Sequence, residues 1–240
     1  MGLDARLRLA RLYLCTDARA QQGDLAEFLD AVLAGGVDVV QIRQHGMSPK
    51  AELGALEVAR RAAAQHQAIV CVHGSPQLAA DFQADMLHLG QHDGPTSEAR
   101  PLLHPWALLG RSASAEAQVV AGLADPDLDY LWVGPLRSGA DPAAPDPGGL
   151  DLVRYASRAA PVYALAAKPW FAVGGITAGN VEAVLEAGAR RVAVGRAVTA
   201  ATDPHAAAAE LARTLHAAWQ ADPASQRYSF AAAGSTGRTR

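Results

Sequence analysis

The segment of residues 170–198 constrains the fold more than any other part of the sequence. A short apolar run opens it and stops at Gly174 and Gly175, and apolar residues at helical spacing follow. A second apolar run, residues 191–194, stops at Gly195. We therefore expect a β-α-β unit in which each strand ends at a glycine.

Glycine at the end of a strand lets the backbone approach a ligand, so that amide groups can point at an anion. Arg196 begins the helix after the second strand, and helix N-termini favour negative charge. Two adjacent glycine-ended strands match the phosphate site at the last two strands of a (β/α)8 barrel. The segment is thus predicted to bind phosphate, the alternative being two tight turns without a ligand.

The rest of the chain alternates strands with helices. Strands are expected at residues 11–16, 37–43, 68–73, 86–89, 106–110, 130–133, 170–173 and 192–194. Helices are expected between them, for example at residues 25–34, 52–65, 77–83 and 115–121. The 240 residues suit one α/β domain, a (β/α)8 TIM barrel, for which about 250 residues are typical.

The predicted barrel covers residues 11–220 and follows an N-terminal extension, residues 1–10. Residues 221–240 are small and polar, so we expect a disordered tail. A stretch rich in proline and glycine, residues 137–149, follows the sixth strand. It is interpreted as a lid over the catalytic face or as a flexible connector.

Composition excludes several classes of protein. The formal net charge of -3 gives no electrostatic case for binding nucleic acid or an acidic membrane surface. Cys15 and Cys71 lie in predicted strands without CxxC spacing, which favours buried reduced thiols over a disulfide or a metal pair. The sequence has neither a signal-peptide core nor an apolar run of membrane-spanning length, so we expect a cytoplasmic protein.

Polar residues follow several strands, where a parallel barrel places its chemistry. Gln41 and Arg43 alternate with apolar neighbours, so both side chains are expected to point into the barrel mouth. A buried arginine needs an anionic partner. A ligand phosphate fits that need, and so does an internal salt bridge to a carboxylate such as Asp17.

The fourth and fifth strands carry three further candidates. Asp93 has the chemistry to hold a divalent cation, although an aspartate after a strand is commonly a helix cap. Gln91 is placed to hydrogen-bond a heterocycle, and Ser112 to donate to a phosphate or to cap the next helix. No Ser-His-Asp order or HExxH pattern is present, which disfavours a hydrolase.

Several motifs at strand ends together resemble the thiamine-phosphate synthase family. They are LYLCTDAR, GGVDVVQIR, DMLHLGQHD, LLGRS, DYLWVGP, and KPWFAVGGITAGNV through RRVAVGRAV, and the resemblance as a whole runs from about residue 11 to residue 216. A thiazole tautomerase shares the barrel and many of these motifs. The histidine that serves the tautomerase is Ser114 here, which weakens that second resemblance.

The resemblance implies a transferase of thiamine biosynthesis that joins hydroxymethylpyrimidine pyrophosphate to thiazole phosphate and releases pyrophosphate. It implies Mg²⁺ as cofactor, with Asp93 as a ligand, and small phosphorylated heterocycles as partners. Ser112 and Arg43 are then the catalytic candidates, acting on the pyrophosphate. The implied substrate-binding residues are Gln41, Arg43, His45, His73, Gln91, Ser112, Gly174, Gly175, Gly195 and Arg196.

The sequence departs from the family on the pyrophosphate side. His45 replaces a lysine, and His73-Gly74-Ser75 replaces Asn-Asp-Arg, which removes the second Mg²⁺ carboxylate. Residues 139–142 replace Thr-x-Thr-Lys. The activity is therefore expected to be reduced, unless the two histidines carry positive charge or, with Asp93, bind a softer metal ion. The alternative is a catalytically degenerate paralogue that binds thiazole or thiamine phosphate as a sensor or partner protein. The oligomeric state is left open, a homo-oligomer included.

Overall fold

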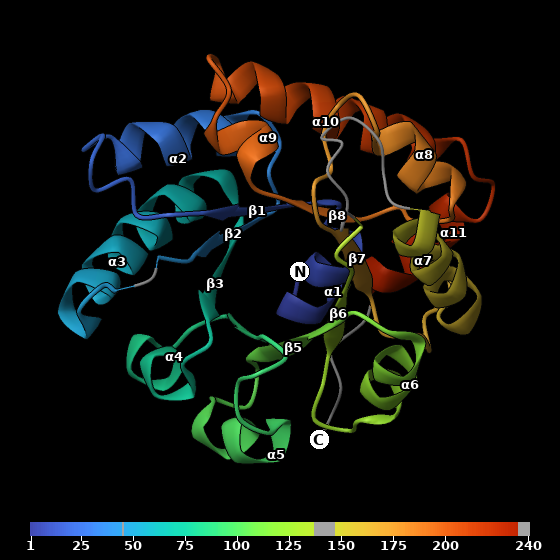
Figure 1. Cartoon of the computed structure of the whole chain (residues 1–240), viewed down its shortest axis with the longest axis horizontal. Helices are drawn as coiled ribbons and strands as arrows, with labels where there is room; N and C mark the ends of the chain where they lie inside the picture. The colour runs from blue at the N-terminus through green and yellow to red at the C-terminus, as the bar shows by residue number, and fades with distance from the viewer. Residues whose placement is uncertain (45, 137–146, 235–240) are drawn as a thin grey trace.

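The protein folds into a closed barrel of eight parallel strands, as the sequence predicted. The computed structural model describes residues 1–44, 46–136 and 147–234. The strands pair in sequence order, and β8 closes the barrel against β1 (Figure 1). They are β1 (Leu12–Thr16), β2 (Val39–Ile42), β3 (Ile69–His73), β4 (Met86–Leu89), β5 (Leu108–Ala113), β6 (Tyr130–Val133), β7 (Trp170–Val173) and β8 (Val192–Val194).

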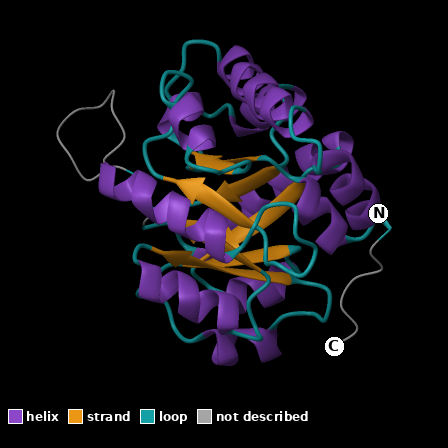
Figure 2. Ribbon diagram, turned by 90° about the vertical axis from the view of Figure 1, so that its right-hand side faces the viewer, coloured by secondary structure: helices purple, strands orange, loops and turns teal. Residues whose placement is uncertain are grey.

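Helices surround the strands in an outer layer, which is plain in two perpendicular views (Figures 1 and 2). The helices are α1 (Leu3–Leu9), α2 (Leu25–Ala34), α3 (Pro49–His66), α4 (Pro76–Phe82), α5 (Thr96–Ala99), the 3₁₀ turn η1 (Arg100–Leu102), α6 (Glu116–Ala124), α7 (Pro147–Ala159), α8 (Val181–Glu186), α9 (Arg196–Thr199), α10 (Pro204–Gln220) and α11 (Ser225–Ala233). None of the described helices is long and apolar enough to cross a lipid bilayer.

Alternate strand residues point into the barrel and fill it with large side chains. Tyr13, Tyr130 and Phe171 are fully buried there. The ring of Tyr13 packs edge-on against that of Phe171, with centroids 5.4 Å apart. The barrel interior is therefore a packed core below the level of the strand ends, so a ligand is confined to the mouth.

The amino-terminal end of the barrel is closed by α1. Leu7 is fully buried in the same apolar cluster as the interior side chains of the strands. Arg6 donates hydrogen bonds of 2.7 and 2.8 Å to the carbonyl oxygens of Gln67 and Ala68. Residues 1–10, expected as a simple extension, thus contain a helix that is part of the barrel core.

The expectation of disorder after residue 220 is wrong for α11. Tyr228 and Ala232 are buried, and the Tyr228 ring lies 5.7 Å from that of Trp219 on α10. Arg191 at the foot of β8 is 1% exposed and donates a 3.1 Å hydrogen bond to the Tyr228 hydroxyl. Small and polar residues suggested a tail, but the burial of Tyr228 and Ala232 orders the helix. Residues 235–240 lie outside the described residues.

The bounds of two predicted elements also differ. The fifth strand starts at Leu108 and runs to Ala113, and Trp106, expected inside it, is 72% exposed. Gly110 is not the end of this strand, because its missing side chain makes room for Tyr130: an added Cβ would lie 2.0 Å from the ring. The predicted loop of residues 137–149 overlaps α7, which begins at Pro147, a residue favoured in the first turn of a helix.

Candidate active site

Four polar side chains converge inside the barrel near the carboxyl ends of β2 to β5. They are Gln41, His73, His88 and Ser112, each at an alternate, inward-facing position of its strand. His73 and His88 are paired in register across β3 and β4, and their rings stack with centroids 6.2 Å apart. This end of the barrel is therefore polar where the layer below it is apolar and aromatic.

Gln41 is fully buried and is held from two sides. The Tyr13 hydroxyl donates a 2.8 Å hydrogen bond to its Oε1 atom, which fixes the orientation of the amide. Its Nε2 atom lies 3.3 Å from Nδ1 of His73 and 3.7 Å from the sulfur of Cys15. The amide therefore supports His73, and neither of its polar atoms faces open space in this structure.

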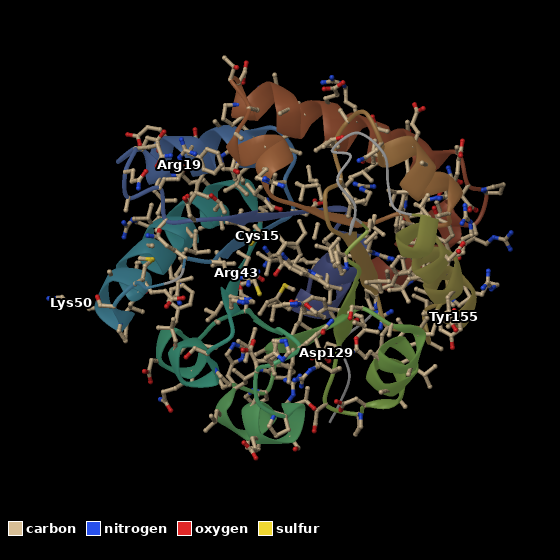
Figure 3. All side chains as sticks on the ribbon, in the orientation of Figure 1. Cys15, Arg19, Arg43, Lys50, Asp129 and Tyr155 are labelled. Atoms are coloured by element: carbon tan, nitrogen blue, oxygen red, sulfur yellow. The ribbon has the colours of Figure 1, made fainter. Side chains whose placement is uncertain are left out.

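Arg43 lies just beyond β2 and is exposed, toward the middle of the ring of strands (Figure 3). No ion pair joins it to Asp17 or to any other described residue, so the internal salt bridge considered from the sequence is not present there. Its charge still acts locally. Burial raises the pKa of the Cys15 thiol, and the nearby guanidinium of Arg43 partly opposes that rise.

Ser112 ends a chain of hydrogen bonds that starts deep in the barrel. Its Oγ atom lies 2.9 Å from Nε2 of His88. Nδ1 of His88 lies 3.2 Å from the Tyr130 hydroxyl, which is 3.7 Å from the sulfur of Cys71. Ser112 does not cap the following helix, because its side chain faces inward and Ala115 holds the N-cap position of α6.

Burial sets the protonation of this chain. It lowers the pKa of His88 well below its usual value, and the charges of His73, Arg43 and Arg111 lower it further. Burial raises the pKa of Tyr130 well above its usual value and that of Cys71 to about 12. All three groups are therefore uncharged at neutral pH.

Asp93 lies in the loop after β4, against the ends of β3 and β4. Its Oδ2 atom accepts a 2.6 Å hydrogen bond from the amide of Gly90, and the carboxylate also lies beside Gly74. It does not cap α5, where Pro95 holds the N-cap position. Arg111 fixes the loop by donating a 2.7 Å hydrogen bond to the Asp93 carbonyl oxygen. Gln91 in this loop is exposed and lines a cavity of about 180 Å³ between β5 and α6.

Within residues 1–44, 46–136 and 147–234, no three His, Cys, Asp or Glu side chains come close enough to hold a metal ion by themselves. Asp93 can still serve Mg²⁺, which is commonly bound by one or two carboxylates together with substrate phosphates and water. One carboxylate oxygen is engaged by Gly90, so the other is the atom available for a metal. The softer site considered from the sequence includes His45, which lies outside the described residues.

The turn after β7 is built from backbone. Gly174 and Gly175 have φ angles of 113° and 68°, which side chains with a Cβ rarely adopt. Asn180, 5% exposed, ties the turn together. Its Oδ1 atom accepts from the amide of Thr177, and its Nδ2 atom donates to the Gly175 carbonyl oxygen, both at 2.9 Å.

The two glycines of this turn have different roles. A Cβ on Gly174 would come within 2.7 Å of Pro135 and Leu136, so its small size is needed for packing against the loop after β6. This packing is a physical reason for Gly174 that does not involve a ligand. Gly175 is the glycine of the pair that remains for the predicted phosphate site.

The turn after β8 continues this edge. An added Cβ on Gly195 would meet only the Cys15 carbonyl oxygen, at an ordinary 3.4 Å, so the space in front of it is otherwise open. Arg196 begins α9, is exposed, and makes no side-chain hydrogen bond or ion pair with a described residue. Because β7 pairs with β8, the two turns lie on adjacent strands at the same end of the barrel.

A larger cavity, of about 700 Å³, lies at the opposite end of the barrel, beside α1 and α3. It is lined by the feet of the strands, where barrels of this class place stabilising rather than catalytic residues. We therefore assign the site to the carboxyl-terminal mouth and not to this cavity. His45 and residues 139–142, which were expected at this mouth, lie outside the described residues.

Three residues that support the mouth from below were missed from the sequence: His88, Tyr130 and Asn180. His88 and Tyr130 are polar residues at inward positions of strands that are otherwise apolar, which is a signal that the alternation pattern contains. Asn180 stands in the quoted GGITAGN motif, but its bonds depend on a turn conformation that the motif does not reveal.

The fold and its polar mouth place the chain among the (β/α)8-barrel enzymes, whose active sites lie at this end. A family model described as thiamine monophosphate synthase matches residues 12–198. The chain belongs to this family, and it is a transferase by that membership.

Relatives named thiamine-phosphate synthase match nearly the whole chain. The one from Thermobifida fusca is 48% identical over 90% of this chain and 97% of its own length. The one from Streptomyces avermitilis is 49% identical over 88% of this chain and 95% of its own. Among solved structures, thiamine phosphate pyrophosphorylase from Pyrococcus furiosus superposes with a TM-score of 0.73 at 25% identity, covering 89% of this chain and 98% of that one.

Proposed function

We propose that the protein is a thiamine-phosphate synthase, which joins hydroxymethylpyrimidine pyrophosphate to thiazole phosphate. The observation that carries the proposal is the identity of close to half of all aligned residues with relatives of that name, over nine-tenths of the chain. The mouth of the barrel supports it, since it offers two separate places for phosphorylated groups.

The reaction exchanges one bond for another without oxidation or reduction. The bond between the pyrimidine methylene carbon and the pyrophosphate oxygen breaks, and its electron pair leaves with pyrophosphate. The nitrogen of the thiazole then supplies the electron pair for the new carbon–nitrogen bond. The protein therefore has to stabilise a polyanionic leaving group and to hold the two rings in line.

We place the leaving group at the edge formed by β2 to β5. Arg43 is an exposed cation without a protein counter-ion in the described chain, so it can neutralise charge on the departing pyrophosphate. Ser112 offers a hydroxyl from the next part of this edge, and His73 a ring nitrogen. Gln91, exposed in the loop after β4, is placed to contact the pyrimidine.

Mg²⁺ would be held at this edge by the free carboxylate oxygen of Asp93 and by the pyrophosphate oxygens. When bound, it supplies positive charge to the leaving group. Asp93 is presented to it by the amide of Gly90 and by Arg111, which fixes the loop through the Asp93 carbonyl oxygen.

We place the thiazole phosphate at β7 and β8. Gly175 and Gly195 leave the backbone of the two turns bare, and Arg196 adds a cation from the start of α9. An oxyanion in this position accepts hydrogen bonds from backbone amides, which need no side-chain reorganisation.

We place the protein in the cytoplasm. Cys15 and Cys71 are both free thiols, which suits a reducing compartment.

The test is direct. Purified protein is incubated with both substrates and Mg²⁺, then with Mn²⁺ or Zn²⁺, and thiamine phosphate and pyrophosphate are measured. We expect both products in equal amounts with Mg²⁺. No product with any of the three metals, together with tight binding of thiazole phosphate, would replace the proposal with that of a binding protein.

A further inference from the structure

A phenol deep in the barrel is connected to the mouth through one histidine. The Tyr130 hydroxyl contacts Nδ1 of His88 at 3.2 Å, and Nε2 of the same ring contacts Oγ of Ser112 at 2.9 Å. Tyr130 and His88 are both fully buried, while Ser112 is half-buried at the rim. The chain of contacts therefore has one closed end in the core and one open end at the mouth.

The protons of this chain can be arranged in two ways. In the first, Tyr130 donates to Nδ1, and the Nε2–H group of His88 donates to Ser112, whose own proton points outward. In the second, Ser112 donates to Nε2, the Nδ1–H group donates to Tyr130, and Tyr130 must donate to the Cys71 sulfur or the Tyr13 oxygen. A neutral imidazole has one donor and one acceptor nitrogen, so these two tautomers exclude each other.

The surroundings of Tyr130 favour the first arrangement. The other described neighbours of its hydroxyl are weaker acceptors than an imidazole nitrogen. The Cys71 sulfur lies 3.7 Å away, and its thiol also lies 3.3 Å from the Val72 carbonyl oxygen as a donor. The Tyr13 hydroxyl, which is also near, donates its own proton to Gln41 at 2.8 Å. A buried hydroxyl without a good acceptor is costly, so Tyr130 donates to the imidazole nitrogen. At the rim, the Ser112 proton can instead go to water or to a ligand.

We propose that Tyr130 and His88 are positioning residues that fix the Ser112 hydroxyl as a hydrogen-bond donor to the pyrophosphate leaving group. The inference rests on the proposed function and deepens it, because it assigns a direction to the Ser112 hydrogen bond. Ser112 is the residue of the chain that touches the substrate. Tyr130 and His88 act through it.

The chain stays uncharged while it does so, because the buried ring of His88 has a pKa well below its usual value. The neutral Nε2–H group of His88 donates a hydrogen bond to the Ser112 oxygen and carries no charge that would attract the pyrophosphate away from Ser112. The Tyr130 ring packs directly on Gly110, so the missing side chain of Gly110 helps to set the position of the Tyr130 hydroxyl.

A double-mutant cycle tests the connection. Ser112→Ala is expected to lower kcat about 100-fold, the size found for one preorganised donor to a developing anion. Tyr130→Phe keeps the ring over Gly110 and is expected to lower kcat about tenfold, with KM for thiazole phosphate unchanged. Combined with Ser112→Ala, Tyr130→Phe should cost nothing further, because residues acting through one another are not additive. A full tenfold loss in the double variant would overturn the proposal.

Two further variants distinguish loss of the Tyr130–His88–Ser112 hydrogen-bond relay from loss of packing. His88→Gln keeps an N–H donor near the Nε2 position and should retain more activity than His88→Ala. Equal losses in these two variants would count against the relay. Tyr163→Phe removes a phenol hydroxyl that contacts the Trp219 carbonyl oxygen, beside Tyr228 and the foot of β8, and should leave kcat unchanged.

Nitrogen NMR of histidine-labelled protein tests the same idea without any turnover. We expect the proton of His88 on Nε2 in the natural protein, and a move toward Nδ1 in Tyr130→Phe. A proton on Nδ1 in the natural protein would overturn the inference even if the enzyme is active. The expected tautomer in a protein that forms no product would instead leave the relay in place and reject the proposed function.

Discussion

The mouth of the barrel is lined mainly by side chains between β2 and β5 and mainly by exposed backbone at β7 and β8. On the first side, Gln41 and His88 are fully buried and each depends on a tyrosine beneath it. On the second, Gly175 and Gly195 present backbone, and Asn180 braces the turn from below. The geometry of the first edge depends on side-chain hydrogen bonds, and that of the second on backbone conformation.

This difference teaches which kind of change each edge tolerates. A side-chain edge loses function when a donor, acceptor or charge is removed, even if the backbone does not move. A backbone edge depends less on side-chain chemistry but is sensitive to any Cβ at a positive φ. Substitutions on the two edges should therefore affect different kinetic constants.

Asp93→Asn should have the largest effect, on the side-chain edge. The asparagine oxygen can still accept from Gly90, so the loop is kept while the charge for Mg²⁺ is lost. We expect kcat to fall about 100-fold or more, as for loss of one electrostatic contact to a leaving group. Steady-state kinetics over a range of Mg²⁺ concentrations measures it. Asp81→Asn, an exposed carboxylate on α4, is the matched control, and equal Mg²⁺ dependence in both variants would refute the role of Asp93.

Gly175→Val should have the next largest effect, on the backbone edge. A branched side chain at a φ of 68° is strained by about 1–2 kcal/mol, and it would cover the amides of the turn. Binding of thiazole phosphate, measured by calorimetry, should weaken at least about tenfold, or about 1.4 kcal/mol. Gly179→Val is the control, because φ is not positive there and the nearest atom to an added Cβ is Thr177 Oγ1 at 3.8 Å. Similar losses in both variants would contradict the assignment.

Arg196→Gln should have a smaller effect on the same edge. Losing one exposed cation at a phosphate is expected to raise KM for thiazole phosphate about twofold to fivefold, since exposed charge pairs contribute about 1 kcal/mol or less. Its kcat should be unchanged. Arg213→Gln on α10, which is also exposed, is the comparison. If Arg196→Gln lowers kcat and leaves KM alone, the phosphate does not lie there.

The last prediction concerns stability on the side-chain edge. Burial lowers the folded-state pKa of His88, so below about pH 6.5 the unfolded chain binds a proton that the folded chain does not. Acidification from pH 7 should therefore reduce the free energy of unfolding, by at most about 1.4 kcal/mol per pH unit from this group. Urea unfolding at pH 7, 6 and 5 measures the slope. His88→Gln should show a shallower slope, and an unchanged slope would show that other groups cause it.

The fold was largely predictable because short apolar runs between turn residues mark buried strands. β4 (Met86–Leu89) and β6 (Tyr130–Val133) were predicted to the residue. The end of β5 was not, because Gly110 has the local signature of a strand end and only the Tyr130 ring explains it. The helix α11 was missed for a similar reason, since its order comes from contacts with distant residues.

The site was predictable in its outline and not in its connections. Alternation along the strand placed Gln41 toward the mouth, and the glycines marked the turns after β7 and β8. The bond from Tyr13 to Gln41 joins residues 28 positions apart, and that from His88 to Tyr130 joins residues 42 apart. Such pairs depend on the stagger of neighbouring strands and on ring orientation, which no local pattern records.

The helix α11 has a practical consequence for handling this protein. Arg191 is buried without a carboxylate partner in the described chain, and its Nε and Nη1 atoms have no hydrogen-bond acceptor there. Its guanidinium instead lies 5.2 Å from the Trp219 ring and 5.8 Å from the Tyr228 ring. Truncating the chain at residue 220 for crystallisation would remove Tyr228, one of these two rings, and expose the buried guanidinium of Arg191 to solvent. A purification tag is better fused beyond α11 than in place of it.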